Sequence, residues 1–225
     1  DSNWHYTEGD SSNHEIKEQY IDALLKSTKI NNFNKKLKIA WDPGNGAAGE
    51  IIEKLVKLLP GEHFLINSKI DGMFPSHHPD PTDPENLKDI ISLVKNKKLD
   101  LGLAFDGDGD RLGLVSGSGK IIWGDQIVAF LSSEVLKDMP NSSIIADVKA
   151  SQNLFNEIKR LGGIPVMWKT GHSFIKSKMK EISSPLAGEM SGHIFFSDRY
   201  YGYDDGIYAA LRVLELIDDK YTLDN

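Results

Sequence analysis

The sequence predicts an α/β fold made of two similar units that follow one another along the chain. Short apolar runs alternate with amphipathic segments of helical spacing, a pattern typical of strands connected by helices. Glycine- and proline-rich turns separate these segments. The alternation occurs twice, so we expect one unit over residues 15–119 and a second over residues 120–225. Residues 1–14 are polar and without periodicity, and we expect a tail or the end of a preceding domain there.

The first unit is expected to begin with a helix over residues 15–28, where apolar side chains recur at helical spacing. A glycine-rich turn, DPGNGAAGE, then leads from a buried strand into an amphipathic helix. Asp83 and Pro84 are typical of the N-cap and first turn of a helix, which we expect over residues 84–97. The predicted strands of this unit cover residues 37–42, 63–66 and 100–106.

The second unit follows an SGSGK turn at residues 116–120, which is expected to close a hairpin. The same alternation of strands and helices then resumes. Near its end, two short strands are expected on either side of a GEMSGH turn. The other predicted strands cover residues 143–148 and 164–168, and the predicted helices cover residues 124–137, 151–161, 172–181 and 204–217.

Composition and charge limit the classes of partner. The 225 residues are 40% hydrophobic and 26% charged, a balance typical of a soluble globular protein. The net charge is −7, and Lys and Arg are scattered among acidic residues, which argues against nucleic acid as a partner. No apolar run approaches the roughly 18 residues of a membrane span. Cysteine is absent, which is compatible with a reducing compartment, and we expect a cytoplasmic protein. We expect neither a membrane nor nucleic acid as a partner.

The strongest functional signal is the segment LGLAFDGDGDRLGLV. Side chains at every second position of an extended chain point to one side, so Asp106, Asp108 and Asp110 can converge on one point. Three carboxylates in one place favour a cation, and a small set of hard oxygen ligands favours Mg²⁺. Arg111 beside these acids suits an anionic ligand that is shared with the metal. The segment therefore predicts a magnesium site.

Two alternatives for this loop are weaker. An EF-hand calcium loop that starts at Asp106 would need glycine at its sixth position and glutamate at its twelfth, where Arg111 and Gly117 stand. A plain turn built on an Asp-Gly pair needs only one aspartate, so it does not explain three aspartates at alternate positions.

Two other stretches are open to a functional or a structural interpretation. The DPGNGAAGE turn lies where a strand meets a helix N-terminus, a place suited to anions, but its spacing matches no nucleotide-binding fingerprint. A structural turn is equally compatible with it. His77 and His78 are neighbours whose side chains should diverge, and no third ligand lies at metal-site spacing. We therefore expect these histidines to pack and form hydrogen bonds within their loop.

Three separated motifs occur in a fixed order: FDGDGDR at residues 105–111, WKTGHS at 168–173, and GEMSGH at 188–193, which is followed by YGYDDGIYAALRVLE. With this order and spacing, the sequence resembles the α-D-phosphohexomutase family, and most closely its bacterial phosphomannomutase/phosphoglucomutase branch. The resemblance runs from about residue 15 to 217. Supporting stretches are DPGNGAAGE, DGMFPSHHPDPTDPENL and IIADVKAS.

The resemblance implies two similar three-layer α/β/α domains with mixed sheets, as in domains 2 and 3 of phosphoglucomutase. The metal loop would belong to residues 15–119 and the sugar-binding loop to residues 120–225. Members of this family have four domains, and neither the phosphoserine stretch nor the phosphate loop of the fourth domain occurs in these 225 residues. We therefore expect the central part of a mutase, inactive alone, with domains 1 and 4 of its parent chain missing.

The implied activity is that of an intramolecular phosphotransferase of carbohydrate metabolism, an isomerase and phosphoprotein that interconverts hexose 1-phosphate and hexose 6-phosphate. The family reaction uses a phosphoserine and a bisphosphorylated sugar, with Mg²⁺ as cofactor and glucose 1,6-bisphosphate as activator of the full enzyme. The resemblance assigns Arg111 to the transferring phosphate and Lys149 to the reacting hydroxyl, both as catalytic residues. It assigns the metal to Asp106, Asp108 and Asp110, and the hexose phosphate substrate to His172, Glu189, Ser191 and His193.

Three alternatives to a mannose- or glucose-phosphate mutase stay open. Haloacid-dehalogenase-type phosphatases also carry Asp-x-Asp after an apolar strand and would use Asp106 as nucleophile, but they prefer Thr or Val where Asp110 stands. Within the family, phosphoglucosamine mutase commonly has Gln where Met190 stands, so Met190 favours mannose and glucose phosphates. The third alternative is a module that binds a sugar phosphate without chemistry.

Overall fold

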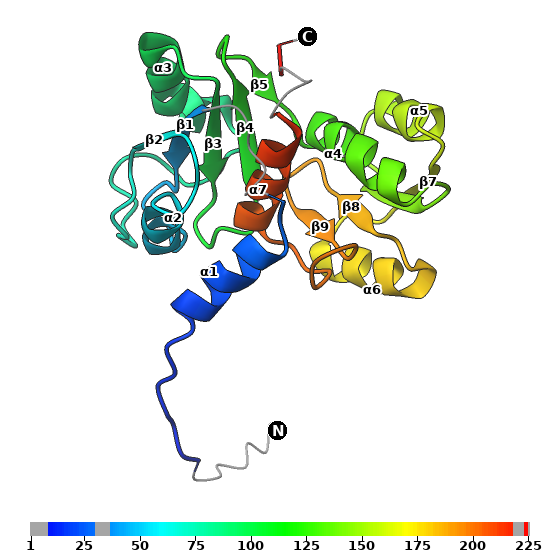
Figure 1. The fold of residues 1–225 in the computed structure, drawn as a ribbon, viewed down its shortest axis with the longest axis horizontal. Helices are drawn as coiled ribbons and strands as arrows, with labels where there is room; N and C mark the ends of the chain where they lie inside the picture. Colours follow the sequence, from blue (N-terminus) through cyan, green and yellow to red (C-terminus); the bar gives the residue numbers. More distant parts are fainter. Residues whose placement is uncertain (1–8, 30–36, 218–222, 225) are drawn as a thin grey trace, which may run out of the picture.

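The computed structural model describes residues 9–29, 37–217 and 223–224 (Figure 1). The expected tail lies outside these residues over positions 1–8, and its described part, residues 9–14, forms neither helix nor strand. Figure 1 shows two groups of strands with helices around each group, and helix α7 (Gly206–Leu216) between them. The predicted α/β fold with two similar units is confirmed.

The first sheet is mixed and has the strand order β2-β1-β3-β4-β5. The first three strands in this order are parallel, and the last two are antiparallel additions. The SGSGK turn closes the β4–β5 hairpin as predicted, with the amide of Ser116 donating to the carbonyl oxygen of Lys120 at 2.9 Å. The strands are β1 (Lys38–Asp42), β2 (Glu62–Leu65), β3 (Leu101–Phe105), β4 (Leu112–Ser116) and β5 (Ile121–Ile122).

One helix of the first unit begins where local side chains indicated, whereas the helix expected over residues 15–28 covers only Lys17–Lys26 and has no side-chain cap. Asp83 accepts a hydrogen bond from the amide of Glu85 at 3.0 Å, so it caps the segment that Pro84 begins. The first turn of the predicted helix is a 3₁₀ helix, and the α-helix follows it. The elements are α1 (Lys17–Lys26), α2 (Gly49–Leu55), η2 (Pro84–Leu87) and α3 (Lys88–Lys97).

The second sheet repeats this plan with the order β7-β6-β8-β9, in which only β9 is antiparallel. Helix α7 begins two residues later than predicted because Asp205 is its N-cap and accepts from the amide of Tyr208. The other elements are α4 (Gly124–Asp138), β6 (Ser143–Asp147), α5 (Gln152–Arg160), β7 (Ile164–Trp168), α6 (His172–Ile182), β8 (Leu186–Gly188) and β9 (Ile194–Phe196).

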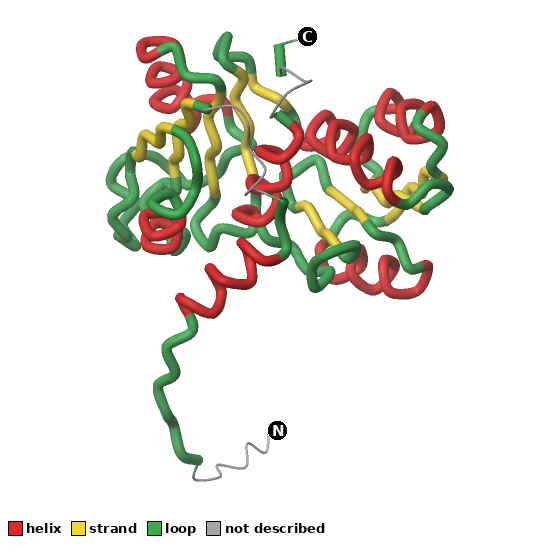
Figure 2. Tube along the Cα trace, viewed as in Figure 1, coloured by secondary structure: helices red, strands yellow, loops and turns green. Residues whose placement is uncertain are grey.

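Each sheet lies between helices, as Figure 2 shows. Helix α3 packs on one face of the first sheet through Ile90 and Val94, and α6 packs on one face of the second through Ile175 and Met179. The opposite faces of both sheets contribute to a single apolar core. The two units are therefore three-layered, but they are not separate in packing.

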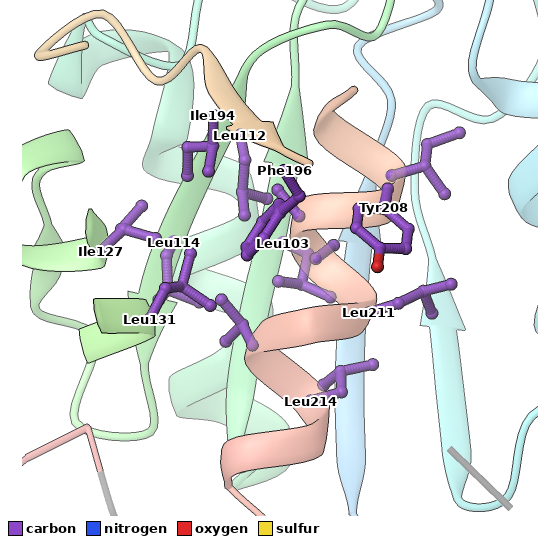
Figure 3. Packing of buried hydrophobic residues seen from close by; sticks show 14 of the residues in the cluster. Leu103, Leu112, Leu114, Ile127, Leu131, Ile194, Phe196, Tyr208, Leu211 and Leu214 are labelled. Carbon is purple, nitrogen blue, oxygen red and sulfur yellow. The ribbon is translucent and has the colours of Figure 1, made fainter. Parts of the chain in front are cut away.

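Helix α7 joins the two units, because it contacts β3 and β4 of the first sheet as well as β9 and α4. Figure 3 shows leucines of β3 and β4 next to side chains of α4, β9 and α7. Buried Arg212 of α7 donates to Glu134 of α4 at 2.9 Å and to Asp198 at 2.9 Å. These ion pairs anchor α7 within the second unit, and its packing on β3 and β4 holds that unit against the first sheet.

The expected domain boundary near residue 120 stays a prediction. Strand β5 at Ile121–Ile122, just beyond that position, pairs with the first sheet. Among the described residues, no helix is both long enough and apolar enough to cross a membrane.

Candidate functional site

The three predicted metal ligands lie in the loop between β3 and β4, at the carboxyl end of β3. Open α/β sheets commonly bind ligands at this end of their parallel strands. Asp106, Asp108 and Asp110 each offer a carboxylate oxygen, and these atoms lie within 4.8 Å of one another. Asp106 is buried, whereas Asp108 is exposed and Asp110 is half-buried. The structure therefore brings together the three acids that the sequence singled out.

Arg111 is held at this loop by two carboxylates. Its Nε donates to Oδ2 of Asp106 at 2.6 Å, and its Nη1 donates to Oδ1 of Asp80 at 3.2 Å. The other oxygen of Asp106 accepts from the amides of Gly109 and Arg111. Burial raises the pKa of Asp106, while the hydrogen bonds from Arg111 act to lower it. These contacts fix the orientation of the guanidinium next to the predicted metal ligands.

The DPGNGAAGE turn supports the aspartate loop. The amide of Ala47 donates to the carbonyl oxygen of Gly107 at 2.9 Å. A Cβ at Gly46 would lie 2.6 Å from that same oxygen, so only glycine allows this approach. The structural interpretation of the turn is therefore supported, and its role here is to position the loop.

The GEMSGH motif forms the turn between β8 and β9. Glu189 is buried, and its carboxylate accepts from the amide of Gly171 and from the hydroxyl of Ser191 at 3.2 Å. Nδ1 of His193 lies 2.9 Å from Oε2 of Glu189 and 3.0 Å from Oγ of Ser191. The three predicted substrate residues of this loop therefore form one hydrogen-bonded group.

The two loops meet, although the sequence predicted them in different units. His193 and Arg111 pair through a β-bridge, and the amide of Leu112 donates to the carbonyl oxygen of Gly192 at 3.0 Å. Nε2 of His193 lies 3.3 Å from Oδ1 of Asp110. The aspartate loop and the GEMSGH turn therefore form a single candidate site at the junction of the two sheets.

Charge at this junction is balanced through His193. Burial by itself would lower the pKa of His193, but hydrogen bonds to Asp110 and Glu189 outweigh burial and raise the pKa to about 9. The hydrogen bond from His193 lowers the pKa of Asp110. Burial opposes ionisation of Glu189, yet its hydrogen bonds, above all that from His193, keep its pKa below the usual range. The imidazolium thus stabilises two carboxylates from different loops.

The remaining predicted residues lie in two places. His172 begins α6, and its ring stacks with that of His193 at a centroid distance of 6.1 Å, so it belongs to the same site. Lys149 follows β6 and is exposed, and it makes no hydrogen bond or ion pair with any residue that the structure describes. The structure therefore brings His172 to the loop junction and gives Lys149 no fixed position there.

Several residues that hold the site together were missed at the sequence level. Asp147, fully buried at the end of β6, accepts from Thr170 at 2.9 Å and from the amide of Met190 at 3.3 Å, so it links the two turns that carry the predicted substrate residues. Asp80 holds Arg111, and Asp204 lies 3.5 Å from His172. One signal was available: two consecutive aspartates precede α7, and a helix needs only one N-cap.

His77 forms hydrogen bonds as expected, although one of them reaches outside its loop, whereas the side chain of His78 is exposed. Nε2 of His77 lies 3.0 Å from Oδ2 of the buried Asp42, and its Nδ1 lies 2.9 Å from the carbonyl oxygen of His78. The hydrogen bond to Asp42 outweighs burial and raises the pKa of His77 to about 9. The pair anchors the proline-rich loop to the end of β1.

The donor set of the aspartate loop fits Mg²⁺. All three side chains offer hard carboxylate oxygens, and the exposure of Asp108 leaves room for water or phosphate, which Mg²⁺ keeps among its ligands. Arg111 lies beside the loop and suits an anion that a metal would share.

Comparison with known proteins identifies the family of both units. Residues 18–119 match the family model for α/β/α domain II of phosphoglucomutase/phosphomannomutase, and residues 123–224 match the model for domain III. A phosphomannomutase/phosphoglucomutase of Pseudomonas putida is 48% identical over 203 residues, which cover 90% of this chain and 43% of that protein. A phosphoglucomutase of Neisseria gonorrhoeae is 44% identical over 210 residues, 93% of this chain and 45% of that protein. The chain thus spans less than half the length of these curated relatives.

Solved structures show the same fold. A phosphoglucomutase/phosphomannomutase family protein of Burkholderia thailandensis superposes with a TM-score of 0.87 at 45% identity, covering 92% of this chain and 44% of that one. An N-acetylphosphoglucosamine mutase of Aspergillus fumigatus, in complex with GlcNAc-6P and magnesium, shares the fold with a TM-score of 0.72 at 15% identity, covering 92% of this chain and 48% of that one. The predicted resemblance is confirmed: the chain belongs to the phosphoglucomutase/phosphomannomutase family, of which it contains α/β/α domains II and III.

Proposed function

We propose that these residues form the metal-binding and sugar-binding centre of a phosphohexomutase that interconverts hexose 1-phosphate and hexose 6-phosphate, with mannose or glucose as the sugar. The main support is the junction of the two loops, where His193 contacts both Asp110 and Glu189. A cation site beside donors and acceptors for sugar hydroxyls suits phosphoryl transfer to a sugar oxygen, because this reaction depends on positioning and charge neutralisation.

We assign Mg²⁺ to Asp106, Asp108 and Asp110, where the bound ion would neutralise charge on the phosphoryl group that is transferred. The magnesium complex of the Aspergillus mutase supports this choice of metal, although that protein shares only the fold. Arg111 would bind a phosphate oxygen, since Asp80 and Asp106 already hold its guanidinium in place.

The sugar-binding residues are assigned from their chemistry. The carboxylate of Glu189 would accept hydrogen bonds from sugar hydroxyls, and Ser191 would donate or accept. His172 and His193 would contact the substrate or its phosphate. Lys149 would assist proton transfer or stabilise charge at the reacting hydroxyl, a role that its exposed position after β6 permits. The phosphorylated serine and the distal phosphate site are proposed to lie in other domains of the full-length protein.

The identity of the sugar, the activator and the cellular location are more specific proposals. Met190, which stands where phosphoglucosamine mutases commonly have Gln, supports mannose and glucose phosphates. Glucose 1,6-bisphosphate is the proposed activator, and the cytoplasmic location stays a prediction from the sequence.

The test is an assay of the full-length protein for conversion of mannose 1-phosphate and glucose 1-phosphate, with glucosamine 1-phosphate as the competing substrate. We expect turnover of the first two that requires Mg²⁺ and is lost in Asp108→Asn but kept in Asp22→Asn, a change at an exposed acid of α1. An acid-stable phosphoserine in the resting enzyme would support the mutase. A labile acyl phosphate on Asp106 would instead identify a phosphatase, and binding of hexose phosphate without turnover would identify a binding module.

A further inference from the structure

Two consecutive aspartates precede α7, and only one of them begins the helix. Asp205 accepts from the amide of Tyr208 at 2.9 Å and from the hydroxyls of Tyr20 and Tyr200. Asp204 takes no part in this cap. Its side chain is only 7% exposed, although an aspartate in a loop would ordinarily be solvated. A buried carboxylate that no cap requires calls for another role.

Asp204 instead contacts the first two turns of α6. Oδ1 of Asp204 accepts a hydrogen bond from Nζ of Lys176 at 2.8 Å. The same Nζ lies 3.2 Å from Nδ1 of His172, which is one helical turn earlier. Lys176 therefore sits between a buried carboxylate and a histidine of the site.

The ammonium of Lys176 determines which nitrogen of His172 can carry a proton. Lysine has three N–H donors and no acceptor, so Nδ1 of His172 must accept in this contact. The ring proton then lies on Nε2, which leaves Nε2–H as the outward donor. The side chain of His172 is 56% exposed, and its Nε2 makes no hydrogen bond to any described residue, so that donor is accessible.

A second oxygen of Asp204 could replace Lys176 as the partner of Nδ1 of His172. Oδ2 of Asp204 is buried and has no hydrogen-bond partner among the described residues, and it lies 3.5 Å from Nδ1 of His172. Without Lys176, this oxygen would accept a hydrogen bond from a protonated Nδ1. Asp110, His193 and Asp204 also lie close enough to resemble a cation site, but the ammonium of Lys176 already neutralises Asp204.

We propose that Lys176, held by Asp204, is a positioning residue that keeps His172 as an Nε2–H donor towards the anionic ligand of this site. His172 thus supplies a directed hydrogen bond, and Lys176 supplies positive charge behind it. The ligand side of this inference rests on the proposed function, because a hexose phosphate is the anion in question. The Asp204–Lys176–His172 arrangement itself is independent of the reaction.

The arrangement can be tested on the ¹⁵N-labelled 225-residue chain without any ligand. Long-range ¹H–¹⁵N spectra at neutral pH report which imidazole nitrogen of His172 is protonated. We expect an unprotonated Nδ1 in the wild type and a protonated Nδ1 in Lys176→Met, where Asp204 becomes the partner. Lys176→Arg, which keeps a cationic donor, should retain the wild-type state, as should Lys180→Met on the exposed side of α6. Adding Asp204→Asn to Lys176→Met should return the proton to Nε2.

A protonated Nδ1 in the wild type, or an unchanged Nδ1 in a folded Lys176→Met, would overturn the proposal. In the full-length protein, Lys176→Met should raise KM for mannose 1-phosphate about tenfold or more, while Lys176→Arg restores most of it and Lys180→Met has no effect. An unchanged KM in Lys176→Met would show that the arrangement does not serve the ligand. Absence of any mutase turnover in the wild type would refute the proposed function and leave the NMR result standing.

Discussion

The imidazole of His193 lies 3.3 Å from Oδ1 of Asp110, although the two residues belong to loops of different sheets. The same ring contacts Glu189 at 2.9 Å. A single side chain therefore connects the metal loop to the sugar loop. Because of this connection, a change in one loop should be felt in the other, contrary to what two separate units would suggest.

Glu189→Gln tests this connection directly. The substitution removes the charge that His193 balances, so the contact between His193 and Asp110 should change. We expect amide chemical shifts to move at Asp110 and Arg111 as well as around residue 189, measured by ¹H–¹⁵N correlation spectra. Glu181→Gln, at an exposed acid of α6, should leave the aspartate loop unchanged. Shifts confined to residues 188–193 would show that His193 does not transmit the loss of the Glu189 charge to the aspartate loop.

Asp108→Asn should weaken Mg²⁺ binding by the chain without altering its fold. The exposed carboxylate of Asp108 makes no hydrogen bond to the described residues, but it is one of the three carboxylates that we assign to Mg²⁺. Losing one of them should reduce the affinity by about tenfold or more, roughly 1.4 kcal/mol. Isothermal titration calorimetry measures the affinity, and Asp22→Asn is the matched control. Equal Mg²⁺ affinity in both variants would show that the metal does not bind at this loop.

The pair of His77 and Asp42 should make stability depend on pH above neutrality. The folded-state pKa of His77 is raised from 6.5 to about 9, so its contribution is fully present below about pH 6.5 and is lost as the pH rises towards 9. His77→Gln should lower the free energy of unfolding by about 1 kcal/mol at pH 6 and by less at pH 10. Urea unfolding at both pH values measures this. His78→Gln, at the exposed neighbour, should show no such trend.

Gly46→Ala should destabilise the aspartate loop. The added Cβ would lie 2.6 Å from the carbonyl oxygen of Gly107, so the loop or the turn must move. We expect a loss of about 1–3 kcal/mol in thermal or urea unfolding, together with weaker Mg²⁺ binding. Gly72→Ala is the control, since nothing lies within 4 Å of its added Cβ. Wild-type stability and metal affinity in Gly46→Ala would show that the turn does not position the loop.

The sequence alone determined the features that depend on local chemistry. The order of strands and helices followed from hydrophobic spacing, and the start of η2 followed from Asp83 and Pro84. The convergence of Asp106, Asp108 and Asp110 also followed from their spacing, because side chains at alternate positions share one side of the chain. The expectation that His77 and His78 form no metal site followed from two local facts: neighbouring side chains diverge, and no third ligand lies at metal-site spacing.

The tertiary structure decided which residues of different elements contact each other. Three contacts of the site join residues that are distant in sequence. Arg111 pairs with His193, Asp80 accepts a hydrogen bond from Arg111, and Asp204 is buried beside Lys176. No local pattern encodes these contacts, because they depend on strand order and on the packing of α7 against both sheets. The sequence could therefore indicate two loops with their chemistry, whereas only the shared apolar core of the two units brings those loops together as one site.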